Sequence, residues 1–337
     1  MAHRKRQRLC RKSSQDLFAD IPDDLVVLIL LKLGESASCP SDFFNAALTC
    51  KRFYSLGVQP MILAKIGTEV MAVRAETWSE SAHRFLVQCV EAGNLEACYI
   101  LGMIRFYCLG NRGSGASLMA RAAMKCHAAA LYSLAVIQFN GSGGTKNDKD
   151  LRAGFALCAR AAFLGHIGAL RELGHCLQDG YGVAQDVAEG RRLLIQANAR
   201  ELACASVSGT GSYTSGLLSD FGCNVDAPPV HPANRFLIGW FSSENSEPSD
   251  GLRMCSHDGC GRPETRSHEF RRCSICCLVN YCSRGCQALD WKLRHKTECD
   301  PIDRWLGADA GEIIEVDAEE EGVDKEATDV EATVGAE

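Results

Sequence analysis

"ARAAMKCHAAALYSLA", residues 120 to 135, and "ARAAFLGHIGALRELG", residues 159 to 174, are two copies of one pattern, thirty-nine residues apart. "EAGNLEACYILG", residues 91 to 102, resembles the second half of both. Self-similarity at this spacing is typical of stacked helix pairs that share one continuous core. We therefore expect an α-solenoid over residues 80 to 204 that presents an extended concave surface. Its small and apolar residues recur at Ala97, Ala130, Ala169, Leu101, Leu134 and Leu173, and its Gly-rich connectors are "NGSGGTKND" and "QDGYGVAQD".

Length and composition indicate a globular chain of two or three domains, since 337 residues include 46% hydrophobic and 23% charged residues. The basic start is not followed by an apolar run of signal-peptide length, and no window approaches the roughly 20 apolar residues that span a bilayer. We expect a soluble, intracellular protein. In a reducing compartment its nineteen cysteines are expected to be metal ligands, catalysts or small buried residues, and not disulfides.

The net charge of -6 is unevenly distributed. Residues 1 to 15 form a basic arm and residues 307 to 337 an acidic tail, and we expect both to be disordered. The arm is either a solvated tail or a nuclear-import signal, so the expected location is the nucleus, the cytoplasm or both. Nucleic-acid binding is disfavoured because no second basic stripe with aromatic residues extends the arm. The basic residues are Arg4, Lys5, Arg6, Arg8, Arg11 and Lys12.

Residues 251 to 302 form a cysteine-rich segment, in which the stretch 273 to 299 alone holds six cysteines and one histidine in a window too short to bury a core of its own. Zinc prefers these ligands, and a closed structural site takes four of them, so eight ligands predict two zinc ions. Disulfides do not suit the compartment, and a catalytic thiol would have to stay outside the ligand pairs. The spare Cys277 is read as incidental. The pairs are Cys255 and Cys260, Cys273 and Cys276, Cys282 and Cys286, and His295 and Cys299.

Residues 16 to 65 predict short helices. Asp20 is placed to cap a helix with Pro22 in its first turn, Leu25, Leu28, Ile29 and Leu33 follow at helical spacing, and Gly34 is expected to end it. A second helix is expected from Pro40, with Phe43, Phe44, Ala47, Leu48, Phe53 and Leu56 at its apolar positions. Periodicity alone indicates no more than a small helical hairpin.

The residues of this segment resemble an F-box. "IPDDL" at 21 to 25, the Leu-Gly at the helix end, an aromatic pair and "TCKRFYSL" at 49 to 56 occur in the order of that family. Two departures are Ile21 in place of the usual leucine and a longer connector from Gly34 to Ser41. The resemblance implies docking on the Skp1 adaptor of a cullin-type ubiquitin ligase. The residues expected to bind the adaptor are Ile21, Pro22, Leu25, Leu28 and Ile29.

The Ala-x-x-x-Leu-Gly motif of the repeats resembles the Sel1 type, a relative of the tetratricopeptide family, and this implies protein or peptide binding. "NYCS" at 280 to 283, Trp291 and the final His295 and Cys299 resemble a MYND finger, which implies interleaved zinc sites and short peptide ligands. An extra residue between Trp291 and His295 leaves the helix register of His295 open. The implied sets are Cys255, Cys260, Cys282 and Cys286 on one zinc, and Cys273, Cys276, His295 and Cys299 on the other.

Residues 205 to 250 are expected to be a linker because they are rich in Gly, Ser and Pro. Its apolar island, residues 236 to 241, is expected to cap an end of the solenoid, and a partner-binding strand is the alternative.

The combination of modules resembles a small group of plant F-box proteins and predicts an all-α chain that is not an enzyme. The expected function is that of a substrate receptor in a Skp1-cullin-F-box ligase, which binds a protein cargo through the repeats, the finger or both. The alternative is a nuclear adaptor or corepressor-like scaffold that never joins a cullin.

Overall fold

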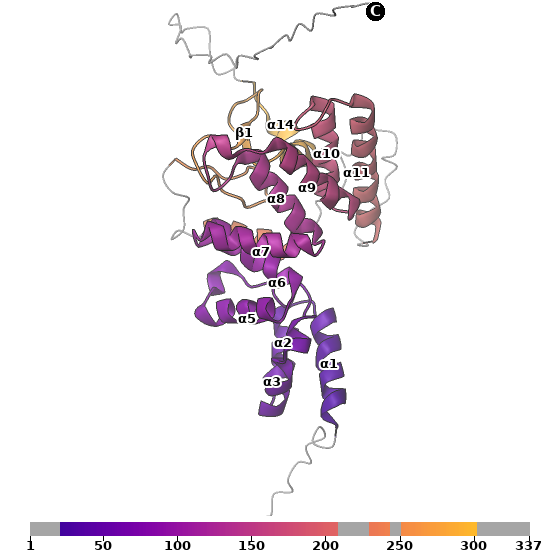
Figure 1. The fold of residues 1–337 in the computed structure, drawn as a ribbon, viewed down its shortest axis with the longest axis vertical. Helices are drawn as coiled ribbons and strands as arrows, with labels where there is room; N and C mark the ends of the chain where they lie inside the picture. Colours follow the sequence, from indigo (N-terminus) through magenta and orange to yellow (C-terminus); the bar gives the residue numbers. More distant parts are fainter. Residues whose placement is uncertain (1–20, 208–228, 243–250, 302–337) are drawn as a thin grey trace, which may run out of the picture. The chain divides into compact units, whose positions relative to one another are not determined.

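The structure is a computed structural model that describes residues 21–207, 229–242 and 251–301 (Figure 1). Within these residues almost every element is a helix, so the all-α prediction is confirmed. The single sheet of the described part pairs β1 (Arg271–Arg272) with β2 (Asn280–Tyr281), antiparallel, with Arg271 opposite Tyr281. No helix in these ranges has the length and apolar character that crossing a membrane requires. The basic arm and the acidic tail lie outside the described residues.

Four short helices follow residue 21: α1 (Asp23–Ser36), α2 (Pro40–Ala47), α3 (Lys51–Gly57) and α4 (Pro60–Leu63). Val26 and Leu30 of α1 are buried with Phe43 of α2. The prediction that Gly34 ends the first helix is wrong, because α1 continues to Ser36 and buries Gly34 against Phe43 and Ile66. The second helix expected from Pro40 is two helices, interrupted between Ala47 and Lys51. The expected cap Asp20 lies outside the described residues.

The repeated segment forms successive helix pairs, coloured purple to pink in Figure 1. Each copy of the pattern begins a helix at the same place: the side chains of Asn94, His127 and His166 accept a hydrogen bond from the backbone N–H three residues later. Such an N-cap satisfies one of the free N–H groups of the first turn. The elements are η1 (Ala75–Thr77), α5 (Glu80–Glu91), α6 (Leu95–Met103), η2 (Ile104–Cys108), α7 (Arg112–Met124), α8 (Ala128–Asn140), η3 (Lys146–Asp148), α9 (Leu151–Phe163), α10 (Ile167–Asp179) and α11 (Val187–Val207).

Helices α6 and α7 cross with their backbones nearly in contact. A Cβ atom added to Gly115 would lie 2.7 Å from the carbonyl oxygen of Gly102 and 2.6 Å from the Phe106 nitrogen. The same approach recurs between α10 and α11, where a Cβ on Gly190 would lie 2.7 Å from the Gly174 oxygen. Glycine is required at these crossings because there is no space for a side chain.

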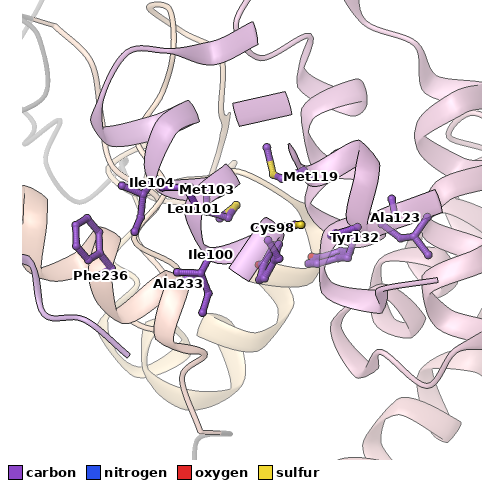
Figure 2. Close-up of a cluster of buried hydrophobic side chains, with 14 of the residues drawn as sticks. Cys98, Ile100, Leu101, Met103, Ile104, Met119, Ala123, Tyr132, Ala233 and Phe236 are labelled. Atoms are coloured by element: carbon purple, nitrogen blue, oxygen red, sulfur yellow. The ribbon is translucent and has the colours of Figure 1, made fainter. Parts of the chain in front are cut away.

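The array core continues into a later part of the chain, as Figure 2 shows. Ile100, Met103 and Ile104 pack with Ala233 and Phe236 of α12 (Pro232–Ser242), and the Phe236 ring lies 5.1 Å from that of Trp78. The apolar island is therefore a helix that packs on η1, α6 and η2. The alternative, a partner-binding strand, is wrong because the island is helical. The rest of the linker, residues 208–228 and 243–250, lies outside the described residues.

Residues 251–301 form a small module with β1, β2, α13 (Arg284–Asp290), η4 (Trp291–His295) and α14 (Lys296–Glu298). Its helix α13 packs against α10, and its loops contact α8. The surface of α8 and α10 is thus partly covered by the same chain. The array does not present this surface as the free, extended face that the repeats alone suggested.

Candidate metal centres and docking surfaces

The first cluster consists of Cys255, Cys260, Cys282 and Cys286, whose sulfur atoms all lie within 4.8 Å of one another. Cys282 follows β2, and Cys286 lies in the first turn of α13, which Ser283 caps by accepting the Cys286 N–H at 3.0 Å. A backbone hydrogen bond of 2.9 Å from Cys255 to Arg262 closes the loop that carries the first pair. All four thiols are buried.

The second cluster consists of Cys273, Cys276, His295 and Cys299, again within 4.8 Å. The extra residue after Trp291 is accommodated by a π-helical turn over Trp291–His295, which turns the imidazole of His295 toward the Cys273 sulfur at 3.4 Å. Cys299 lies one residue beyond α14, where the backbone is already extended. Cys277 lies outside both clusters, with a left-handed backbone at φ 53°.

The spacing of the ligand atoms fits zinc. Tetrahedral sites with Zn–S bonds of about 2.3 Å place sulfur atoms roughly 3.8 Å apart. Cys260 and Cys282 are separated by 3.5 Å, Cys282 and Cys286 by 3.6 Å, and Cys273 and Cys299 by 4.0 Å. The two groups are the same interleaved sets that the finger resemblance implied, and the assignment of each set to one ion stays a prediction.

Arg262 lies beside the first cluster and was missed in the sequence. It is 4% exposed, donates from Nη1 to the Cys260 sulfur at 3.5 Å and from Nη2 to Ser133 Oγ of α8 at 2.8 Å. Burial opposes its charge, but the thiolates of Cys260 and Cys282 outweigh burial and raise the pKa of the guanidinium. Four thiolates on one Zn²⁺ leave a formal charge of about -2, which this arginine partly neutralises.

Two other arginines of the finger pair with carboxylates. Arg284 pairs with Asp179 at 2.8 Å, and Arg294 pairs with Glu298 at 2.7 Å. The sequence could not single out Arg262, because its role depends on a contact with Ser133, far away in the sequence. Its position two residues after Cys260 was too weak a signal by itself.

Glu172 of α10 joins the array to the finger. Its carboxylate is 1% exposed and accepts the backbone N–H groups of Arg284, at 3.3 Å, and Gly285. These are free donors of the first turn of α13. Burial raises the pKa of the Glu172 carboxyl, and the N–H of Gly285 and the charge of Arg284 partly offset that rise.

A cavity of about 640 Å³ lies between the array, the start of α12 and the finger. Tyr99, Tyr132 and His166 line it from the array, with the rings of Tyr132 and His166 4.7 Å apart. The finger contributes Leu289 and Leu293. Aromatic and aliphatic walls with a few polar groups are typical of ligand pockets.

The edge of this cavity is held by a carboxylate between two histidines. Glu96 lies 2.9 Å from His127 Nε2 and 2.8 Å from His231 Nε2, and so connects α6 with the residues that directly precede α8 and α12. Burial acts to raise the pKa of Glu96, but the two histidines more than offset burial and hold that pKa at about 2.

Three of the residues expected to bind an adaptor lie on one side of α1, and Ile21 and Pro22 directly precede this helix. Leu25, Leu28 and Ile29 are 50%, 55% and 50% exposed, while Val26 and Leu30 on the other side are fully buried. Ile21 is half-buried and Pro22 exposed. Arg52 of α3 fixes the start of the helix by donating to Asp23 Oδ1 at 2.7 Å. An apolar face exposed on a well-packed helix is a mark of an interaction site.

Comparison with known proteins agrees with these modules. Residues 69–162 match a family described as plant tetratrico peptide repeats, and residues 255–299 match the MYND finger. F-box protein At1g67340 of Arabidopsis thaliana is 64% identical over 88% of this chain and 84% of its own length. F-box protein At5g50450 of the same plant is 60% identical over 94% of this chain and 97% of its own length. The chain belongs to this family of plant F-box proteins.

The MYND finger of this F-box family member binds zinc, and the two clusters fit two ions. F-box, repeat and MYND modules are typically non-catalytic interaction modules. A Sel1 repeat protein from Oxalobacter formigenes is also similar, with 24% identity, a TM-score of 0.32, and 35% of this chain and 89% of that chain covered.

Proposed function

We propose that this F-box protein is the substrate-recognition subunit of a Skp1-cullin-F-box ubiquitin ligase and acts without catalytic residues of its own. The observation that carries the proposal is the exposed apolar face of α1, formed by Leu25, Leu28 and Ile29. A partner that covered these side chains would remove apolar surface from water, which stabilises the complex by about 25 cal/mol for each Å² buried. Family membership supports a Skp1-type adaptor as that partner, with a cullin bound through it.

The cargo is proposed to bind at the cavity between array and finger. The finger and α12 cover part of the repeat surface, so a ligand there would contact both modules at once. Tyr99, Tyr132 and Leu293 offer the apolar contacts that a short peptide segment needs. This placement combines the two cargo-binding alternatives in one site.

The experiment is a reconstitution of the full chain with a Skp1-type adaptor, followed by addition of a cullin. We expect this chain, the adaptor and the cullin to elute together as a stoichiometric ternary complex on size-exclusion chromatography. Binding to the adaptor without recruitment of the cullin would favour the second candidate, a non-degradative nuclear adaptor, for which the basic N-terminal arm is the supporting observation. The proposed location is accordingly the nucleus, the cytoplasm or both.

A further inference from the structure

We propose that the two zinc sites are not equivalent: the repeat array holds the first cluster, whereas the second cluster is supported by the finger alone. Zinc at the first cluster should therefore leave slowly and together with the finger-array contact. Zinc at the second cluster should be released first, and the array should stay folded after this release.

Backbone groups of the first cluster are bound by side chains outside the finger. Asn140 of α8 donates from Nδ2 to the carbonyl of Cys282 at 2.8 Å, and Asn234 of α12 donates to the carbonyl of Cys260 at 2.6 Å. The cap of the helix that carries Cys286 is bound as well, since Tyr132 Oη lies 3.2 Å from Ser283 Oγ. Contacts of this kind orient metal ligands, and their loss commonly weakens metal binding.

The ligand charge of the first cluster is balanced by Arg262 of the finger, and the array holds this arginine in place. Arg262 bridges the Cys260 sulfur and Ser133 Oγ, and Ser133 Oγ lies 3.2 Å from Tyr99 Oη. Ser133 is fully buried. Opening the interface would leave these polar groups without partners or expose the thiolate cluster to water, so metal release and interface opening are coupled.

The second cluster has different surroundings. The described hydrogen bonds of its ligands stay within the finger. The backbone N–H of Cys273 donates to the carbonyl of Val279 at 3.0 Å, and the carbonyl of Cys273 accepts the N–H of Cys277 at 3.0 Å. Cys299 is partly exposed, and Ile275 and Leu278 beside this cluster are 43% and 69% exposed. Lys292 of the π-helical turn, which is not a ligand, contacts the array: it donates to Asn198 and lies 3.9 Å from Glu201, both on α11.

The test follows zinc release from the full-length protein with an excess of a chromophoric zinc chelator. Two phases of equal amplitude are expected, one zinc each. Cys299→Ser should remove the fast phase and keep the slow one. Asn140→Ala should accelerate the slow phase roughly three- to tenfold, as expected for one lost hydrogen bond, and leave the fast phase unchanged.

Asn234→Ala provides an independent variant on α12 should Asn140→Ala fail to fold. Asn147→Ala, at an exposed asparagine of η3, is the matched control expected to change neither phase. Circular dichroism after the fast phase should retain the helical signal. The proposal would be overturned if both ions left in one phase, or if Cys299→Ser lost the slow phase. It would also be overturned if Asn140→Ala or Asn234→Ala changed both phases equally, or if the slow phase were unchanged in both variants.

Discussion

Arg262 of the finger donates a hydrogen bond of 2.8 Å to Ser133 Oγ in the middle of α8, 129 positions earlier in the chain. The same guanidinium contacts the Cys260 sulfur, so a metal ligand and the repeat core share one buried side chain. The finger is thus built into the array and does not hang from it on a linker.

Ser133→Ala tests this contact. The substitution leaves Arg262 Nη2 and Tyr99 Oη without their buried partner, and we expect a loss of about 1–3 kcal/mol in the free energy of unfolding. Urea titration monitored by circular dichroism measures it. Ser274→Ala, which removes an exposed hydroxyl, should stay within about 0.5 kcal/mol. Equal stability of the two variants would show that the contact contributes nothing.

Gly115→Ala tests the crossing of α6 and α7. The new methyl group would lie 2.6 Å from the Phe106 nitrogen, so the helices must separate, and we expect a destabilisation of about 1–3 kcal/mol or more. Gly113→Ala is the matched control in the same helix, because nothing lies within 4 Å of its added Cβ. There the better helix propensity of alanine should stabilise by up to about 1 kcal/mol. Thermal melting of both variants measures these effects. A change of the melting temperature in the same direction in both variants would contradict the close crossing.

The N-cap His166 should make the protein acid-sensitive. Burial lowers the pKa of His166 to about 4, and its neutral Nδ1 accepts the Ala169 N–H at 3.0 Å. The unfolded chain, with a histidine pKa near 6.5, binds the proton more readily. This group's contribution to stability is therefore present above pH 6.5 and is lost as the pH falls toward 4.

His166→Asn keeps the cap, as Asn94 does in the first repeat, but cannot be protonated. Between pH 7.5 and 5.5 the wild type should lose about 1 kcal/mol more stability than this variant. Comparison of the two proteins at each pH cancels the acid sensitivity of the zinc ligands. Parallel pH profiles would mean that His166 does not titrate in this range.

Leu25→Asp tests the docking face of α1. Leu25 is half exposed in the free protein, so the variant should fold, but a carboxylate buried under a partner costs several kcal/mol. Binding to a Skp1-type adaptor, measured by calorimetry, should weaken at least a hundredfold. Phe163→Asp is the matched control, since Phe163 is a 90% exposed apolar residue on α9. Undiminished binding by Leu25→Asp would show that the adaptor does not dock on this face of α1.

The sequence was sufficient for what depends on short-range patterns. The period between residues 120 and 174 predicted the helix pairs, and the pairing of cysteines predicted two metal clusters. It was insufficient where distant segments meet: Gly34 reads as a helix end but is buried against Phe43 and Ile66, and the island around Phe236 completes a core begun by Trp78. Asn140 and Glu172 look like ordinary helix residues until the finger lies against them.

If this chain joins a cargo to a ligase, the turnover of that cargo should slow in cells that express the full-length Leu25→Asp variant. A point variant is preferable to removal of the N-terminal helices, because Asn94 of the array donates to the carbonyl of Leu63 at the end of α4. Proteins that co-purify with the wild type under proteasome inhibition define the cargo, and their half-lives are then measured without the inhibitor. We expect Leu25→Asp to bind this cargo still and to lengthen its half-life, whereas Phe163→Asp should bind the cargo and leave its half-life unchanged. Cargo that stays bound to Leu25→Asp and is degraded at the wild-type rate would show that the chain does not deliver cargo to a ligase.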